Sequence, residues 1–240
     1  MSESALRYAT RQSVALALAV GLSLCLGVSS KSVGDVGSSN APLSGRAHII
    51  DGDTIVLGGI HIRLEGIDAP ETAQTCARRE GGTWPCGQES TKGLASLIDG
   101  KQVSCTDRGL DKYGRVLGTC KVGMLDINAE MVRRGLACAF VRYSPAYAAI
   151  ESEAKAAQRG IWQAAATPAW DFRAQRWAGS EVAAPNGCAI KGNVTRHGRI
   201  YHMPWSPWYG HVQMGNDPEK RWFCSEAEAI TAGWRPAGGR

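Results

Sequence analysis

Apolar and polar residues alternate along several short runs of the chain, and this period of two predicts half-buried β-strands. Gly58 and Gly59 separate two of these runs and predict a two-residue hairpin turn. The predicted strands comprise residues 47–50, 54–57, 60–64, 102–106 and 116–122.

Apolar residues spaced three and four apart predict helices at 87–98 and 147–159. A further helix is predicted from Asn128, a suitable N-cap, to Arg134, and a short strand at 136–141 follows it. Five strands in a small curled sheet, with a helix inserted after the third, match an α+β architecture, the five-stranded OB-fold β-barrel with three helices.

The start of the chain has a different pattern. Residues 1–30 are typical of an export signal, because two arginines precede an apolar run at 14–28 that is shorter than the roughly 20 residues needed to span a bilayer. We expect removal of this segment, with retention as a membrane anchor as the alternative. Residues 31–43 are rich in Ser and Gly and predict a flexible linker to a domain at 44–177.

A second, smaller module is predicted near the end of the chain. The segment around Trp170 and Phe172 is expected to pack back on the barrel, and a linker at 178–186 follows it. Residues 187–236 are then predicted to form a compact, aromatic-rich accessory module. Ser225 is suited to cap the helix near the end of this module.

The cysteines predict covalent links between neighbouring segments. Eight cysteines less Cys25 of the predicted signal leave seven, and outside the cytosol neighbouring thiols usually oxidise. Spacing leaves Cys138, within an apolar run, as a buried free thiol. Six cysteines allow fifteen pairings, so the following set is a hypothesis. The pairs are Cys76 with Cys86, Cys105 with Cys120, and Cys188 with Cys224.

The composition fits one or two globular domains, with 240 residues, 44% of them apolar, and a net charge of +5. This basic balance favours polyanionic partners only weakly, because a mean charge does not say where the charges lie on the surface.

Acidic residues gather at the ends of the first strands. Asp53 closes one turn, and Asp68 and Glu71 lie just past a later strand. Arg63 lies between Asp53 and Asp68 in the sequence. Each alone is typical of a turn. Together, three close carboxylates repel one another unless a cation lies among them, and oxygen ligands select a hard divalent ion, Ca²⁺ or Mg²⁺.

A second charged motif, DKYGR, occupies residues 111–115. A hairpin turn with solvated charges would explain it equally well. Two arginines that face a metal site are, however, a recurring arrangement for a phosphate diester, because their planar donors match phosphate oxygens and stabilise developing negative charge.

Four ordered motifs, IDGDTIVL, IRLEGIDAPET, DKYGR and GLACAFVRY…GIW, together resemble the staphylococcal nuclease family over roughly residues 45–177. The resemblance implies an OB-fold and a Ca²⁺-dependent phosphodiesterase that acts on DNA and RNA and leaves 3′-phosphates.

The resemblance also implies a metal centre and a residue that handles water. Asp53, Asp68 and the main-chain carbonyl of Ala69 match the family's Ca²⁺ ligands, and an alanine preserves a ligand that is a backbone oxygen. Glu71 matches the residue that activates or orients the attacking water.

The remaining matches concern the nucleic acid. Arg63 and Arg115 match the family's phosphate clamp, and Lys112 and Tyr113 match groups near the outer phosphate and the base. No charged catalytic position of the family is lost, which favours an active enzyme.

Simple strand geometry opposes one part of this site. With Gly58 and Gly59 as the turn, Arg63 pairs with Thr54, and alternation places its side chain on the opposite face of the sheet from Asp53. Convergence of the two residues therefore requires a bulge or a strong curl at the barrel end.

Two other segments have both a binding and a structural interpretation. Arg78 and Arg79 are candidates to contact a nucleic-acid backbone and Trp84 to stack on a base, but a disulfide-closed, solvated loop is favoured. In the C-terminal module a disulfide is favoured over a zinc site. The zinc candidates are Cys188, Cys224, His202 and His211.

The predicted function is an exported, monomeric Ca²⁺-dependent nuclease with DNA and RNA as substrates and no inferred protein partner. The first alternative is a nucleic-acid-binding OB module without catalysis, which Arg63, Glu71 and Arg115 argue against. A third reading is an envelope-binding protein whose C-terminal module has the main role.

Overall fold

The computed structural model describes residues 42–238. The predicted export signal at 1–30, and all but the last two residues of the predicted linker at 31–43, lie outside the described residues. A search of the described helices finds none with the length and apolar character needed to cross a membrane.

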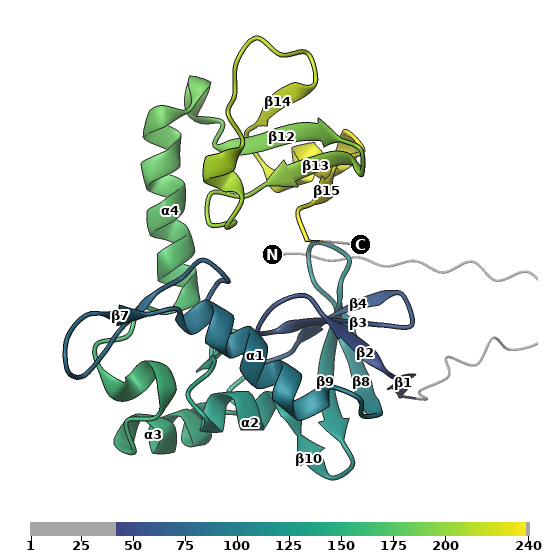
Figure 1. Cartoon of the computed structure of the whole chain (residues 1–240). Helices are drawn as coiled ribbons and strands as arrows, with labels where there is room; N and C mark the ends of the chain where they lie inside the picture. Colours follow the sequence, from purple (N-terminus) through teal and green to yellow (C-terminus); the bar gives the residue numbers. More distant parts are fainter. Residues whose placement is uncertain (1–41, 239–240) are drawn as a thin grey trace, which may run out of the picture. The chain divides into compact units, whose positions relative to one another are not determined.

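A curled, seven-stranded sheet forms the centre of the first part of the described chain (Figure 1). Its strand order is β1-β8-β9-β4-β3-β2, and β10 pairs with β9. Neighbouring strands are antiparallel except β4 and β9, which are parallel. The strands are β1 (Leu43–Gly45), β2 (Ala47–Ile49), β3 (Thr54–Leu57), β4 (Ile60–Leu64), β8 (Val103–Leu110), β9 (Val116–Val122) and β10 (Leu125–Asp126).

Helices α1 and α2 bury their apolar sides against this sheet. Leu94 of α1 and Met131 of α2 are fully buried in one cluster with Ile55 and Ile62 of the sheet. Burial of such side chains is the main stabilising contribution to the fold. The α-helices are α1 (Cys86–Ile98), α2 (Ile127–Arg133), α3 (Ala148–Ala156), α4 (Ala169–Ala183) and α5 (Glu226–Thr231).

The predicted mixture of helices and strands is confirmed, but the predicted count of three helices before the C-terminal module is wrong. Helix α4 is a fourth, and it includes residues 178–183, which we predicted as linker. The sheet has seven strands because the short strands β1 and β10 extend the pairing expected from five. The assignment to the OB-fold stays a prediction.

The predicted hairpin is present in the expected register. Leu57 pairs with Ile60 across Gly58 and Gly59, and both glycines have positive φ, the conformation that glycine adopts most readily in such a turn. The alternation of buried positions in β3 and β4 places one side of the hairpin in the core.

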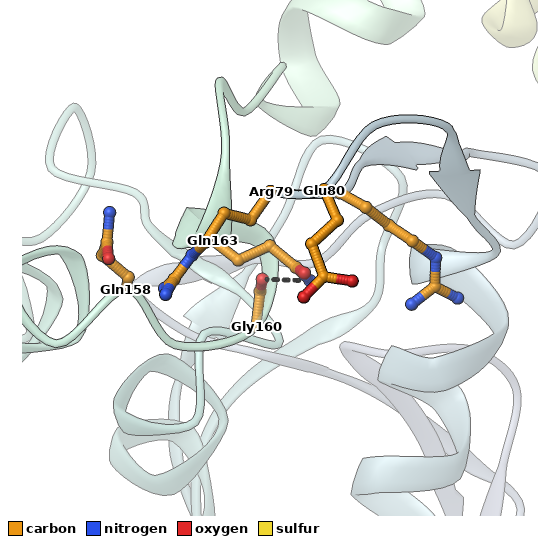
Figure 2. Close-up of a pocket in the computed structure, with 6 residues that line it drawn as sticks. Arg79, Glu80, Gln158, Gly160 and Gln163 are labelled. Atoms are coloured by element: carbon orange, nitrogen blue, oxygen red, sulfur yellow. Dashed lines mark hydrogen bonds between the residues drawn. The ribbon is translucent and has the colours of Figure 1, made fainter.

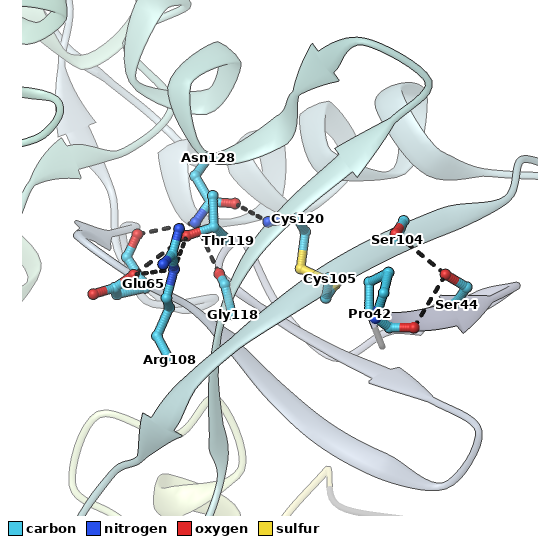
Figure 3. Close-up of a disulfide and its surroundings, with 10 residues drawn as sticks. All are labelled: Pro42, Ser44, Glu65, Ser104, Cys105, Arg108, Gly118, Thr119, Cys120 and Asn128. Carbon is cyan, nitrogen blue, oxygen red and sulfur yellow. Dashed lines mark hydrogen bonds and ion pairs between the residues drawn. A yellow bond between two sulfur atoms is a disulfide. The ribbon is translucent and has the colours of Figure 1, made fainter. Parts of the chain in front are cut away.

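The predicted N-cap of the second helix is wrong. Asp126 caps α2, because its carboxylate accepts a hydrogen bond from the N–H of Ala129 at 2.9 Å. Asn128 is instead fully buried: its side-chain oxygen accepts from the N–H of Cys120, and its amide donates to two backbone carbonyl groups (Figure 3). Asn128 therefore fastens the helix to strand β9.

The predicted strand at 136–141 shortens to β11 (Cys138–Ala139), which pairs with β5 (Ile67–Asp68). This pairing places Asp68 opposite Cys138, so it fixes the backbone of a predicted site residue. A second short pair consists of β6 (Cys76–Ala77) and β7 (Thr83–Trp84).

All three predicted disulfides are confirmed, and Cys138 is a buried free thiol. Cys105 and Cys120 lie directly opposite each other on β8 and β9 (Figure 3). The bond between Cys188 and Cys224 occupies both cysteines that were candidate zinc ligands.

The last part of the chain contains a four-stranded sheet of order β14-β12-β13-β15. Its core includes Tyr201 and Phe223, and the side chain of Ser225 caps α5 as predicted by accepting from the N–H of Glu228. The strands are β12 (Ile190–Thr195), β13 (Gly198–His202), β14 (Lys220–Phe223) and β15 (Arg235–Pro236). The 3₁₀ turns within residues 42–238 are η1 (Gly160–Gln163), η2 (Pro185–Gly187) and η3 (Tyr209–His211).

Candidate active site

One guanidinium group joins the two aspartates that the sequence singled out. Arg63 Nη1 lies 2.6 Å from Asp53 Oδ1, and Arg63 Nη2 lies 2.6 Å from Asp68 Oδ1. The side chain of Asp68 is fully buried and that of Asp53 nearly so. Two buried carboxylates are thus held around one positive charge, which offsets their mutual repulsion.

The position of Asp53 resolves the conflict with strand alternation. Strand β3 starts at Thr54, opposite Arg63 as predicted, so Asp53 lies in the bend before the strand and does not follow its alternation. The carbonyl of Asp53 accepts from the N–H of Leu64 at 2.8 Å, and Asp53 Oδ2 accepts from the N–H of Ala69 at 2.9 Å. These bonds direct the carboxylate toward Arg63.

A second arginine, Arg173 of helix α4, completes the cluster. Its Nη2 lies 2.8 Å from Asp68 Oδ2, and its Nη1 lies 2.7 Å from Glu71 Oε1 and 3.2 Å from Asp68 Oδ1. Arg173 thus connects the predicted metal carboxylate Asp68 to the predicted water-handling residue Glu71.

A buried glutamine holds the loop that carries Glu71. Gln74 Oε1 accepts from the N–H of Glu71 at 3.2 Å, and Gln74 Nε2 donates to the carbonyl of Thr167 at 2.8 Å. Thr167 lies two residues before α4, so the same side chain connects the Glu71 loop to the start of the helix that carries Arg173.

Burial alters the acidity of the carboxyl groups. It raises the pKa of Glu71 to about 7 against the opposing charge of Arg173, and it raises the pKa of Asp51 to about 6 with help from the charge of Asp53. Burial also acts on Asp53, but the charge of Arg63 and the N–H of Ala69 outweigh it and lower the pKa of that carboxyl group.

The DKYGR motif influences this cluster through its charge, but its side chains bond to one another rather than to the cluster. Arg115 Nε lies 2.7 Å from Asp111 Oδ2, and its charge helps to lower the pKa of Asp53. Lys112 Nζ and the Arg115 guanidinium lie 4.7 and 5.4 Å from the centre of the Tyr113 ring. In the described part of the chain, no direct bond joins Arg115 to the three carboxylates of the cluster.

Comparison with known proteins decides the family. A family described as "Staphylococcal nuclease homologue" matches residues 61–164. An uncharacterized endonuclease of Escherichia coli is 36% identical over 55% of this chain and 86% of its own length. The chain belongs to the staphylococcal nuclease homologue family.

Other relatives have different lengths and names. The succinoglycan biosynthesis protein ExoI of Rhizobium meliloti is 36% identical over 54% of this chain and 69% of its own length. The probable staphylococcal-like nuclease CAN3 of Oryza sativa is 38% identical over 50% of this chain, but the match spans only 30% of that protein. Family membership supports the prediction of a phosphodiester hydrolase.

The oxygen atoms at this site suit a hard cation. Asp53, Asp68 and the carbonyl of Ala69 would supply only oxygen ligands, the type that Ca²⁺ prefers. Among residues 42–238, no three His, Cys, Asp or Glu side chains form a ready metal cluster. The oxygen ligands of the site fit Ca²⁺, and in this structure guanidinium groups donate to both oxygens of Asp68.

Sequence reasoning missed Arg173, Gln74 and Asp51. Arg173 follows Trp170 by three residues and the buried Ala169 by four, so one face of α4 carries all three. The sequence indication for Arg173 was an arginine on the same helix face as two residues that pack against the domain. For Gln74 and Asp51 the sequence pattern held no comparable indication.

The loop from β6 to β7 confirms the structural interpretation of its tryptophan. Trp84 is buried beside the bond between Cys76 and Cys86, so it presents no open face to a base. Arg78 and Arg79 are exposed, and both line a polar pocket with Glu80, Gln158, Gly160 and Gln163 (Figure 2). None of these lining residues belongs to the carboxylate cluster.

Proposed function

We propose that the chain is an exported, monomeric Ca²⁺-dependent nuclease that hydrolyses phosphodiester bonds of DNA and RNA and leaves 3′-phosphates. The observation that carries this proposal is the bridge of Arg63 between Asp53 and Asp68, with Glu71 connected to the same cluster. The family resemblance supplies the metal, the substrates and the product, and relatives named as nucleases support it.

Asp53, Asp68 and the carbonyl of Ala69 would hold the cation. A bound Ca²⁺ would offset the negative charge of a phosphate oxygen and so make phosphorus easier to attack. The hydrogen bond from the N–H of Ala69 to Asp53 Oδ2 keeps Asp53 beside the residue whose carbonyl is the predicted backbone ligand.

Glu71 would act on the water. Its carboxylate accepts a proton as the water oxygen bonds to phosphorus, the bond from phosphorus to the 5′ oxygen breaks, and the departing oxygen takes a proton from solvent. A pKa of about 7 is well placed for this transfer near neutral pH. Arg63 and Arg115 would hold the negative charge that develops on the phosphate, while Lys112 and Tyr113 bind the nucleotide.

Export is consistent with the covalent structure. The described residues contain three disulfides, which are typical of proteins outside the reducing cytosol. We propose a nuclease domain at 44–177, of the OB-fold type, and an accessory module at 187–236.

A chelator-controlled digest tests the proposed function. Supercoiled plasmid should be cut in Ca²⁺ and left intact when the ion is chelated. Arg63→Ala and Glu71→Gln should each slow cleavage by about 10²-fold or more, because each removes a preorganised charge or the proton acceptor. The rates are measured from loss of supercoiled DNA.

Arg133→Ala is the matched control, since Arg133 is paired with Glu130 on the surface of α2. This variant should cut at the wild-type rate. Plasmid binding without cleavage by the wild-type protein would select the nucleic-acid-binding module instead. Undiminished cleavage by an Arg63→Ala, Glu71→Ala double variant would refute the assigned site.

A further inference from the structure

Arg173 uses oxygen atoms that the proposed cation would need. Asp68 Oδ2 accepts from Arg173 at 2.8 Å, and Asp68 Oδ1 accepts from Arg173 at 3.2 Å and from Arg63 at 2.6 Å. Both oxygens of this fully buried carboxylate are therefore engaged by guanidinium groups. Neither faces open solvent.

A guanidinium and a divalent cation are poor neighbours at one carboxylate. Charge-assisted hydrogen bonds from Arg173 reduce the electron density that Asp68 can offer to a cation, and the two positive groups repel each other. Arg173 also bonds Glu71 Oε1 at 2.7 Å, so it offsets two acidic charges at once. The two guanidinium groups therefore offset much of the charge of the three carboxylates without a metal ion.

We propose that Arg173 is a built-in competitor of the divalent cation, which must displace its guanidinium from Asp68 and Glu71 to bind. This inference rests on the proposed function, because it takes Asp53 and Asp68 as cation ligands. It gives α4 a role in the site: because the helix carries Arg173, it helps to set the cation concentration at which the site loads.

The surroundings of Arg173 allow its guanidinium to leave. Its side chain is 23% exposed, and the only fully buried residue of α4 is Ala169. The helix is held independently of Arg173, since Trp170 stacks on Phe140 with ring centres 5.3 Å apart. A long arginine side chain can thus change rotamer while the helix stays in place.

Calorimetric titration of the full chain with Ca²⁺ tests the proposal without measuring activity. Arg173→Ala should bind Ca²⁺ about tenfold more tightly than wild type, because removal of a competing state raises the binding-competent fraction. Arg176→Ala is the matched control on the same helix, since Arg176 Nε donates to the carbonyl of Pro204 and not to the cluster. The control should bind with wild-type affinity.

Several results would overturn the proposal. Unchanged or weaker Ca²⁺ affinity in folded Arg173→Ala would show that Arg173 does not compete with the cation. That result would leave the proposed cation site itself intact. Absence of Ca²⁺ binding in wild type and variant alike would refute the cation site and the competition with it. If the alanine variant does not fold, Arg173→Lys must show a smaller change in the same direction, since lysine cannot keep the two-pronged contact.

Discussion

Glu71 shows how a single residue reports on the state of this site. Its side chain is 22% exposed, and its only charged partner at hydrogen-bond distance in the described chain is Arg173. Burial outweighs that partner and raises the pKa of Glu71 to about 7. In the folded protein without metal, the carboxyl group therefore holds a proton at a pH where the unfolded chain has lost it.

This difference predicts how stability depends on pH. Between the unfolded pKa near 4.5 and the folded pKa near 7, the folded state binds more protons, so stability should rise as pH falls through this range. Glu71→Gln cannot titrate and should lack this contribution, which is on the order of 3 kcal/mol at most. Urea unfolding in a chelating buffer at pH 7.5 and pH 5 measures the difference, and equal pH dependence in both proteins would contradict it.

The residue types of the site were predictable, but their convergence was not. Asp53, Arg63 and Asp68 were identified from motifs, and the structure joins them within hydrogen-bond distance. Strand alternation placed Arg63 and Asp53 on opposite faces because the rule was extended to Asp53, which lies one residue before the first residue of β3. Arg173 lies 105 residues after Asp68, and no local pattern connects positions so far apart in the chain.

At the scale of elements, helix α2 shows the difference between a residue type and its environment. Asp126 and Asn128 are both suitable caps by type, and only the folded chain distinguishes them. Asp126 binds the N–H of Ala129 at the helix start, whereas Asn128 is fully buried and makes three hydrogen bonds to the backbone.

Substitution should therefore affect the two residues differently. Asp126→Ala removes a cap and should cost about 1 kcal/mol. Asn128→Ala leaves the buried N–H of Cys120 without its acceptor and the carbonyl of Glu65 without this donor. The carbonyl of Gly118 keeps the N–H of Glu65, and the substitution should cost about 3 kcal/mol. Urea unfolding at neutral pH measures both. A cost for Asn128→Ala equal to or below that for Asp126→Ala would show that Asn128 does not fasten the helix as described.

The elements that the sequence predicted best are those with strong local signals. The hairpin of β3 and β4, helix α1 and the Ser225 cap of α5 follow from glycine turns, apolar spacing and cap chemistry. Helix α4 was missed because few of its residues are buried, so it lacks the apolar periodicity of a packed helix. The strand at 136–141 shortened because its ends find no neighbouring strand to pair with in the described chain.

At the scale of the whole molecule, disulfides tie together segments that differ in their depth of burial. Cys105 and Cys120 are fully buried within the sheet, whereas Cys76 to Cys86 closes a surface loop and Cys188 to Cys224 closes the last part of the chain. In the chain-entropy account, closing the 10-residue and 36-residue separations contributes about 3 and 4 kcal/mol respectively.

These links predict a distinct pattern of thiol reactivity. In protein that is denatured but not reduced, alkylation should modify Cys138 and none of the six paired cysteines, because only thiols react. Without denaturant Cys138 should also resist, since burial raises its pKa and blocks access. Peptide mass spectrometry before and after reduction identifies each cysteine and serves as its own control. Alkylation of Cys188 or Cys224 before reduction would show that this disulfide is absent. These two cysteines would then again be candidate zinc ligands.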